Sequence, residues 1–341
     1  MKYEAITIKD IAKALGLATS TVSRALKGSY EISADTKKLV LDYAEKINYR
    51  PNPIALSLKE KRSRAIGVVV CEIANTFFSQ VINGIESIAY DRGYYVIISQ
   101  SHESYDREVL NTRHLASRSV DGLLVSLSTE TTDMSHFHSL HDKGLPIVFF
   151  DRVCDTIDTH KVIADNFKGA YDATVHLLGS GFKKIAHITS SPNISITRER
   201  LAGYRRALEE NGIPYEDELV KYCAHGGLRH DELEAELADL MSQRVQPDAI
   251  LAASDRISMG AMAWLTEQNI SIPGQIALVG FTNSQQVGIL SPALTAVTQP
   301  AFEMGRIATE KLIDIIESKQ PIIRYDTTVL KTEFTIRQSS L

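Results

Sequence analysis

The sequence has no long apolar run and few cysteines. None of its apolar stretches approaches the roughly 18 residues of a membrane-spanning helix, and the charged start, Met1 to Asp10, is unlike a secretory signal. Cys71, Cys154 and Cys223 lie far apart with no CxxC pair, which favours reduced packing thiols over a disulfide or metal framework. These absences predict a cytoplasmic protein with no membrane partner.

The motifs that mark common enzymes are also missing. The sequence holds no GxSxG, HExxH, Walker phosphate loop or GxGxxG. The dense histidine cluster His136, His138 and His141 could place two rings on one helix face, but it offers no evident third ligand or acidic partner. We therefore expect a solvated surface helix there. No catalytic residue, metal or cofactor is expected, and the chain is not expected to be an enzyme.

Charge is unevenly distributed along the 341 residues, a length that predicts two or three domains. The net charge is −5, but Met1 to Arg64 carries 13 Lys or Arg against 7 Asp or Glu, a balance of +6. The remainder carries 24 basic and 35 acidic residues, a balance of −11. A cationic front on an acidic body suits an appended phosphate-binding module, although chance clustering gives differences of this size too.

The first 50 residues are predicted to form three short helices. Thr7 and Asp10 have the spacing of a capping box that opens the first helix, and a second helix follows between Ala18 and Leu26. Ser33 can cap a third helix, which ends before Pro51 because proline disfavours helix in the residue that precedes it. This order predicts a compact all-α head.

The first two of these helices, joined by a tight Gly-containing turn, have the pattern of a helix-turn-helix. Thr19, Ser20 and Thr21 offer hydroxyls for base edges or phosphates, and Arg24 offers a donor fork that can read guanine. Any capped helix can begin with Ser and Thr, so the motif alone leaves an ordinary helix pair equally open.

From Ala65 onward, short apolar runs alternate with amphipathic stretches. This alternation predicts parallel sheets with helices on both faces, which bind small ligands at the carboxyl ends of their strands. Two blocks, about 61–160 and 161–290, predict two similar lobes with a cleft between them. The expected strands are 66–70, 95–98, 122–125, 147–150, 185–188, 249–252 and 276–280, and the expected helices are 79–90, 107–117, 168–178, 200–210 and 257–267.

Three stretches of the front segment closely resemble, in order and spacing, the head of the lactose repressor and galactose repressor family: Thr7–Ala12, Thr21–Arg24 and Tyr49–Asn52. The resemblance implies that Thr19 and Ser20 discriminate bases. Ala18 stands where the family more often has serine at the recognition-helix cap, so capping there is weaker or supplied by Thr19. The implied DNA contacts of the head are Thr7, Thr19, Ser20, Thr21, Ser23, Arg24, Tyr49 and Asn52.

Residues 53–59 resemble the family's hinge helix, which orders on operator DNA. The resemblance implies that Leu58 wedges into the minor groove, that Ala55 allows close approach and that Lys59 contacts a phosphate. Such a wedge kinks the duplex at a cost of about a few kcal/mol, which wider contact offsets. A helix this short is marginal alone in water, so its folding can be made conditional on DNA. An ordinary apolar linker packed on the body is the alternative.

The body from Ala65 to Arg337 resembles the family's regulatory domain, itself similar to periplasmic sugar-binding proteins. The matching stretches are Val120–Leu124, Arg200–Tyr204, Pro247–Ile250, Val279–Phe281 and Leu294–Pro300. The resulting fold class is α/β, with an all-α helix-turn-helix head and hinge helix followed by a two-lobed body of two doubly wound parallel sheets. The expected domains are a head at 1–50, a hinge helix and linker at 51–64, and an effector-binding and dimerisation body at 65–341, with lobe one at about 65–160 and 292–323 and lobe two at about 161–291 and 324–341.

A sugar site needs flat apolar faces and groups that pair with hydroxyls. Phe77 and Phe78 are as consistent with core as with a stacking platform, and Asp255 is as consistent with capping the next helix as with ligand contact. Thr282 stands where the family commonly has aspartate, so no particular sugar carries over from relatives. The candidate effector-binding residues are Phe77, Phe78, Ser128, Asp151, Arg200, Ser254, Asp255, Thr282 and Gln299.

Together these features predict a sequence-specific transcriptional regulator, with repression as the expected activity. We expect a homodimer on a pseudo-palindromic operator, controlled allosterically by a small-molecule effector, a sugar or sugar derivative, bound between the lobes. The alternative is a solute-binding sugar receptor of the same fold with no DNA function. That alternative requires export, and the basic head argues against it.

Overall fold

The computed structural model describes residues 6–49, 62–244, 246–320, 322 and 324–341. The chain divides into two compact units, Met1–Ser63 and Arg64–Leu341. We call them the head and the body. No helix among the residues that the structure describes is long and apolar enough to span a bilayer.

The head contains the three helices that the sequence predicts: α1 Ile8–Leu15, α2 Thr19–Leu26 and α3 Ala34–Lys46. The three helices share one hydrophobic core. It contains Ile11, Val22 and Val40, one from each helix, and all three are fully buried. The Asp10 carboxylate accepts hydrogen bonds from the Thr7 backbone N–H at 2.8 Å and the Thr7 hydroxyl at 2.7 Å, which fixes the start of α1.

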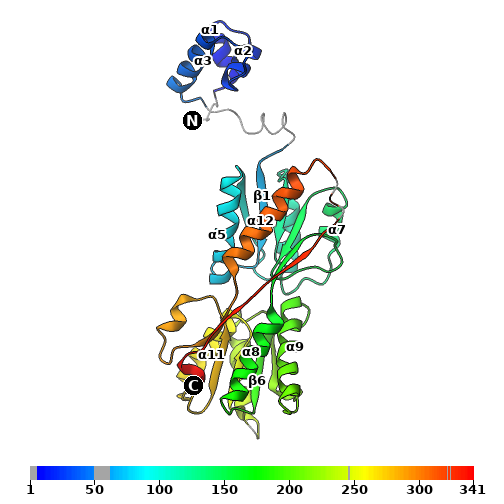
Figure 1. Ribbon diagram of the computed structural model, residues 1–341, viewed down its shortest axis with the longest axis vertical. Helices are drawn as coiled ribbons and strands as arrows, with labels where there is room; N and C mark the ends of the chain where they lie inside the picture. The colour runs from blue at the N-terminus through cyan, green and yellow to red at the C-terminus, as the bar shows by residue number, and fades with distance from the viewer. Residues whose placement is uncertain (1–5, 50–61, 245, 321, 323) are drawn as a thin grey trace. The chain divides into compact units, whose positions relative to one another are not determined.

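The body contains two six-stranded sheets, one in each lobe, and helices cover both (Figure 1). The seven strands expected from the sequence are all present. The first sheet, in the order β11-β5-β4-β3-β1-β2, is wholly parallel and consists of β1 Ala65–Val70, β2 Tyr95–Gln100, β3 Gly122–Val125, β4 Ile147–Phe150, β5 Lys161–Ala164 and β11 Thr327–Leu330. The second sheet, in the order β12-β10-β9-β8-β6-β7, consists of β6 Ile185–Ser190, β7 Val220–Cys223, β8 Ala249–Ala252, β9 Ala277–Phe281, β10 Thr295–Thr298 and β12 Glu333–Thr335.

The strand pairings correct the expected lobe boundaries and sheet type. β5 pairs with β4, so the first lobe extends to residue 164 rather than 160. β10 pairs with β9 in the second sheet although 292–323 was assigned to lobe one, and β11 pairs with β5 in the first sheet although 324–341 was assigned to lobe two. β12 runs antiparallel to β10, so the second sheet is not purely parallel. The reason is that β11 and β12 pair with the edges that β5 and β10 would otherwise leave open, and this pairing satisfies backbone groups irrespective of sequence order.

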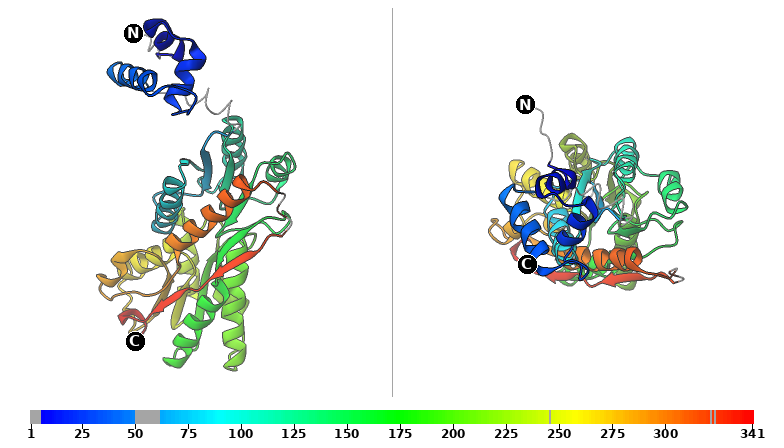
Figure 2. Two further views of the ribbon diagram at one scale, coloured as in Figure 1. Left: turned by 45° about the horizontal axis from the view of Figure 1, so that its top comes forward. Right: turned by 90° about the horizontal axis from the view of Figure 1, so that it is seen from above.

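The chain therefore crosses between the lobes three times, from β5 to α8, from β10 to α12 and from β11 to β12. All three crossings lie along the same edge of the body, because β11, β5, β12 and β10 end the two sheets on that side. The left view in Figure 2 shows the C-terminal segment running past both lobes. The body helices are α5 Thr76–Asp91, α6 Tyr105–Ser117, α7 Ser135–His141, α8 Asn166–Gly179, α9 Ser195–Glu210, α10 His230–Ser242, α11 Asp255–Glu267 and α12 Ala301–Glu317.

Each lobe holds one pair of helices that touch through glycine. A β-carbon at Gly84 of α5 would lie 2.0 Å from the Phe302 carbonyl oxygen of α12, and one at Gly203 of α9 would lie 2.2 Å from the Phe167 carbonyl oxygen of α8. The two pairs therefore approach at backbone distance. This gives a physical reason for the glycine in the Arg200–Tyr204 motif, whose Tyr204 is fully buried beside it.

Candidate functional site

The carboxyl ends of the two sheets meet, and several side chains bridge the lobes there. We call this region the inter-lobe site. An ion pair joins α11 to the end of β1, and hydrogen bonds of 2.8 to 3.4 Å make the other links. The bridging pairs are Arg256–Glu72, Asn283–Gln80 at 2.8 Å, Gln299–Asp151 at 3.4 Å and the Val153 N–H with the Ser195 hydroxyl at 3.4 Å.

Asp151 ends β4 at the centre of this region. Its backbone is left-handed, with φ at 59°, and its side chain is buried. Burial raises the pKa of this carboxyl, and the nearby guanidinium groups of Arg152 and Arg200 pull the pKa down in part. A strained, desolvated carboxylate with Gln299 at 3.4 Å is poised to accept hydrogen bonds from a ligand's hydroxyls.

Arg200 is buried in the second lobe and is held rigidly. Its Nε and Nη2 both donate to Asn166 Oδ1, at 3.0 and 2.7 Å, and its Nη1 donates to the Ala253 carbonyl at 2.6 Å. Its guanidinium carbon lies 4.2 Å from the centre of the Phe281 ring. Burial lowers the pKa of Arg200 to about 10, which leaves it charged at neutral pH.

Arg152 is a buried residue that the sequence analysis missed. Its Nη1 donates to Glu103 Oε2 at 2.7 Å and to the Leu127 carbonyl at 3.3 Å, while its Nε has no hydrogen-bond partner. Glu103 also accepts from the Thr129 N–H at 2.9 Å. The available signal was its position: Arg152 directly follows the predicted strand end and Asp151. We add Arg152 and Glu103 to the site.

The two lobes also lie close together near Glu103. The loop after β7 contains Gly226, and a β-carbon there would lie 3.9 Å from Glu103 Oε1 and 3.4 Å from the Ser190 hydroxyl. Gly226 also has a left-handed φ of 63°, which glycine adopts without strain. This contact lies at the β2–β7 edge, opposite the three chain crossings.

Several buried hydroxyls at the strand ends have no hydrogen-bond partner. A buried polar group without a partner costs free energy, so such a cluster marks a place where a ligand or water completes the bonding. The unpartnered atoms at or just beyond the strand ends, among those the structure describes, are the hydroxyls of Ser101, Ser126, Thr129, Thr189 and Ser190, the Thr197 hydroxyl in α9 and the Nε of Arg152.

The candidates after β8 and β9 separate into two roles. The Ser254 hydroxyl caps α11 by accepting from the Ile257 N–H at 3.3 Å, so the capping group is Ser254 rather than Asp255. The Thr282 hydroxyl donates to Asp255, and burial raises the pKa of that carboxyl. Asn283, which directly follows Thr282, donates to the Gln299 carbonyl at 2.7 Å.

Three first-lobe candidates are engaged within the lobe. Phe77 and Phe78 pack edge to face, with ring centres 5.2 Å apart, and both belong to the buried core cluster. The Ser128 N–H and the Thr131 hydroxyl donate to the buried Glu108 carboxylate, each at 2.8 Å. These contacts favour a structural role for all three candidates.

The histidine cluster differs from the solvated helix that we expected. His136 in α7 is buried, and its Nε2 lies 3.2 Å from Glu108 Oε1. His138 and His141 are half-buried. Among the residues that the structure places, no group of histidine, cysteine and acidic side chains could hold a metal ion.

In the head, Thr19, Ser20 and Arg24 are exposed on α2, while Thr21 and Ser23 are half-buried. Helix α2 begins after Ala18 with no side-chain cap, so Thr19 does not supply one. Tyr49 is half-buried against the head core. Asn52, Ala55, Leu58 and Lys59 lie outside the described residues.

Comparison with known proteins places both units. A model of bacterial regulatory proteins of the lacI family matches residues 7–52, and a model of a periplasmic binding protein-like domain matches residues 174–340. The transcriptional repressor PurR of Vibrio atlanticus (strain LGP32) is 32% identical over 313 residues, 92% of each chain. Catabolite control protein A of Priestia megaterium is 29% identical over 308 residues, 90% of this chain and 91% of that one.

Solved structures agree with this assignment. The transcriptional regulator CelR in complex with cellobiose has a TM-score of 0.72 at 28% identity and covers 98% of this chain and 99% of that one. A lac repressor dimer bound to operator has a TM-score of 0.84 at 23% identity, covering 99% and 100%, and shows the shared fold.

Head and body together define a DNA-binding regulator with a small-molecule sensor. The chain belongs to the lacI family of bacterial regulatory proteins, which confirms the resemblance found in its sequence. It is a transcriptional regulator under the control of a small-molecule effector and is not an enzyme.

Proposed function

We propose that this regulator is a cytoplasmic repressor that binds a pseudo-palindromic operator as a homodimer. A sugar bound between the lobes changes its affinity for the operator. The observation that carries the effector part is the inter-lobe site. There Asp151 and Arg200, buried and from different lobes, lie among hydroxyls that lack partners. The cellobiose complex of CelR supports a carbohydrate in a relative of the same fold.

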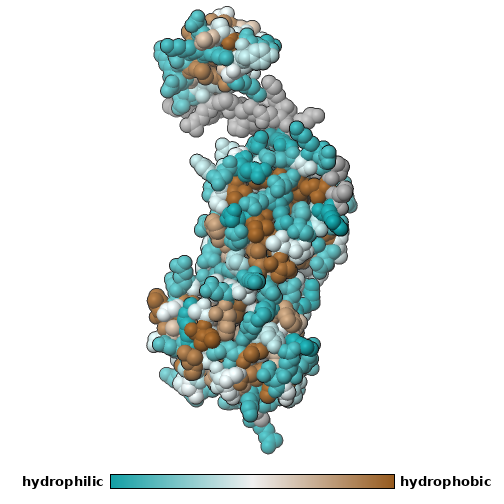
Figure 3. All heavy atoms as spheres, in the orientation of Figure 1, coloured by the Kyte–Doolittle hydropathy of each residue, from teal (hydrophilic) through white to brown (hydrophobic). Residues whose placement is uncertain are grey.

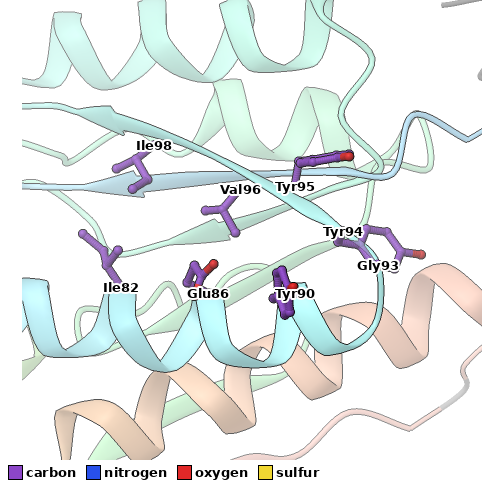
Figure 4. A pocket seen from close by; sticks show the side chains of 8 residues that line it. All are labelled: Ile82, Glu86, Tyr90, Gly93, Tyr94, Tyr95, Val96 and Ile98. Carbon is purple, nitrogen blue, oxygen red and sulfur yellow. The ribbon is translucent and has the colours of Figure 1, made fainter. Parts of the chain in front are cut away.

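The exposed edge of the first lobe supports self-association. Tyr90 of α5 and Tyr95 of the edge strand β2 are each 76% exposed, and Ile98 is 37% exposed. Between them α5 and β2 form a groove of about 430 Å³, shown in Figure 4. An unpaired edge strand flanked by aromatic side chains suits pairing with a second copy.

Further apolar side chains are exposed on other elements of the body. Phe302 of α12 is 48% exposed and Val329 of β11 is 55% exposed. The face seen in Figure 3 carries several apolar patches over both lobes. A dimer that covers such surface gains hydrophobic stabilisation in proportion to the area removed from water. The dimer that the lac repressor forms on its operator supports this assembly.

For DNA, we assign the exposed face of α2 to the major groove and the hinge segment to the minor groove. Thr19, Ser20 and Arg24 read bases, and Leu58 wedges between base steps. Two heads carried by a dimer reach half-sites about one helical turn apart.

The test is selection of full-length protein on a random duplex library, followed by fluorescence anisotropy on the enriched sequence. We expect a pseudo-palindrome, dissociation constants of about 10⁻⁸ M or tighter and a steep loss of affinity with salt. A protein that enriches no sequence would overturn the regulator assignment and favour the solute-receptor alternative. An enriched site without internal symmetry would overturn the dimer.

A further inference from the structure

The charged groups of the inter-lobe site are already paired. Arg152 donates to Glu103 at 2.7 Å and lies 3.9 Å from Asp151. Arg256 forms an ion pair with Glu72. Arg200 is fixed by an amide and a carbonyl rather than by a free anion, and it interacts electrostatically with Asp151.

The charge count of this region is negative. The arginines Arg152, Arg200 and Arg256 face carboxyl groups on both lobes: Glu72, Glu103, Asp151, Glu199 and Asp255. Burial raises the pKa of Asp151, Glu199 and Asp255, although the charges of Arg152 and Arg200 lower the pKa of Asp151 in part and that of Arg200 lowers the pKa of Glu199 in part. A further anion placed here would meet like charge in a desolvated setting, which costs affinity.

Helix starts offer little more to an anion. Asn75 caps α5 by accepting from two backbone N–H groups, Asp165 caps α8, and Ser254 caps α11. The carboxyl of Asp255 adds a negative charge to the first turn of α11. Helices α6, α9, α10 and α12 begin without a side-chain cap, so their first backbone N–H groups remain for oxygen acceptors.

Most of the groups left free are hydroxyls, and the Nε of Arg152 is one further free donor. The hydroxyls of Ser101, Ser126 and Thr129 lie in the first lobe, and those of Thr189, Ser190 and Thr197 lie in the second. A hydroxyl both donates and accepts, as each hydroxyl of a sugar does. A phosphate at neutral pH mainly accepts hydrogen bonds and needs a cluster of unpaired donors or cations.

We propose that the inter-lobe site selects an uncharged polyhydroxy ligand, an unphosphorylated sugar or sugar alcohol, and rejects phosphorylated and carboxylated sugars. This inference rests on the proposed effector site and narrows its ligand class. Glu103 enforces the selection because it neutralises Arg152. Of the three arginines named above, Arg152 is the one that belongs to the first lobe. Without that carboxylate, Arg152 would be free to pair with an anion.

The experiment is isothermal titration calorimetry with full-length protein and a panel of aldopentoses, aldohexoses and their alcohols. Each sugar is matched with its terminal phosphate and its aldonic acid, and inorganic phosphate serves as a bare anion. We expect at least one neutral compound to bind and its phosphate to bind at least about 100-fold more weakly, since like-charge contact costs several kcal/mol and each 1.4 kcal/mol is tenfold. A phosphate or acid that binds more tightly than its neutral parent overturns the proposal, and so does a panel in which no neutral compound binds.

The variant Glu103→Gln supplies a second, independent arm. It removes the charge but keeps a similar shape, so we expect the ratio of neutral to phosphorylated affinity to fall at least about tenfold. Glu267→Gln, an equal charge change at the exposed end of α11, should leave the ratio unchanged. If the ratio of neutral to phosphorylated affinity is the same in both variants, Glu103 does not cause the discrimination against anions.

Failure of this inference is separable from failure of the proposed function. If a phosphorylated sugar binds and shifts affinity for the enriched duplex, the effector site stands and only the ligand class is wrong. If a neutral sugar binds but changes affinity for no duplex, the ligand class stands and the allosteric function is wrong.

Discussion

Arg24 Nη1 lies 3.0 Å from Glu31 Oε2, so the arginine that we assign to base contact holds a carboxylate within its own head. Both side chains are about half exposed. The pair is therefore worth little in stability, about 0–1 kcal/mol. On DNA, however, the carboxylate competes with the guanine or phosphate that Arg24 would bind.

We predict that Glu31→Gln strengthens operator binding about two- to fivefold at low salt. In this variant Arg24 does not have to break its ion pair with Glu31 before it contacts DNA. Fluorescence anisotropy at two salt concentrations measures the effect. Glu45→Gln makes the same charge change on α3 of the head and controls for net charge. If both variants gain equally, Glu31 acts through the overall field and not through Arg24.

Arg200→Lys should weaken effector affinity about 100-fold or more while operator binding without effector persists. Lysine keeps the charge but cannot donate to Asn166 Oδ1 and the Ala253 carbonyl together, and hydrogen bonds of charged groups contribute about 1.5–3 kcal/mol each. Calorimetry with a neutral sugar that binds the wild type gives the readout. Arg205→Lys, on the exposed side of the same helix, should bind normally. Wild-type affinity in Arg200→Lys would place the arginine outside the site.

Asp151→Asn should stabilise the ligand-free protein at neutral pH and abolish most effector binding. Because burial raises the folded-state pKa of Asp151, its contribution to stability is full below the unfolded pKa and is lost as pH rises through the folded pKa. Asparagine removes that loss and tolerates the left-handed backbone at this position.

Thermal unfolding between pH 4 and pH 8 tests this. We expect Asp151→Asn to unfold about 1–3 °C higher at pH 8 and the gap to close towards pH 4. A gap that widens on acidification would reverse the sign of the shift and contradict the assignment. Asp142→Asn, at the exposed end of α7, is the matched control.

Gly203→Ala should destabilise the second lobe by about 1–3 kcal/mol, because the added methyl meets the Phe167 carbonyl oxygen at 2.2 Å and the two helices must move apart. Gly179→Ala, also in a helix but with nothing within 4 Å, should be neutral or slightly stabilising. Chemical denaturation of both variants measures the difference. Equal stability would mean that α8 and α9 separate freely.

Leu58→Ala should weaken binding to the enriched duplex by at least about tenfold, since the apolar wedge that kinks the DNA is lost. Effector affinity measured by calorimetry should stay within about twofold of wild type. Operator affinity equal to wild type would refute the wedge and leave an ordinary linker in its place.

Much of the fold could be predicted because the buried strands are continuous apolar runs. Ile147–Phe150 and Ala249–Ala252 are wholly buried, and each stands out in the sequence. The edge strands β11 and β12 are partly exposed and mix polar with apolar residues, so the same signal fails there. Helix α10 was missed although Leu233, Leu237 and Leu240 have helical spacing and are buried.

The candidate site was harder to predict than the fold. Asp151 and Arg200 were predicted because Asp151 ends an expected strand and Arg200 begins the Arg200–Tyr204 motif, and their ligand role stays a prediction. Arg152 and Glu103 were not predicted because they lie 49 residues apart in the sequence, and no motif or spacing indicates that they pair. Ser128 was predicted because it follows a strand, as ligand residues do; its backbone N–H donates to Glu108 of α6, and its ligand role stays a prediction.

The three chain crossings along one edge of the body restrict how the lobes can separate. Sliding would stretch all three connections at once, whereas rotation about that edge strains none of them much. Opening must then be widest at the far side, where Gly226 faces Glu103. The loop of Gly226 therefore leaves Glu103 first, while the ion pair between Glu103 and Arg152, which lies wholly within the first lobe, stays intact during opening.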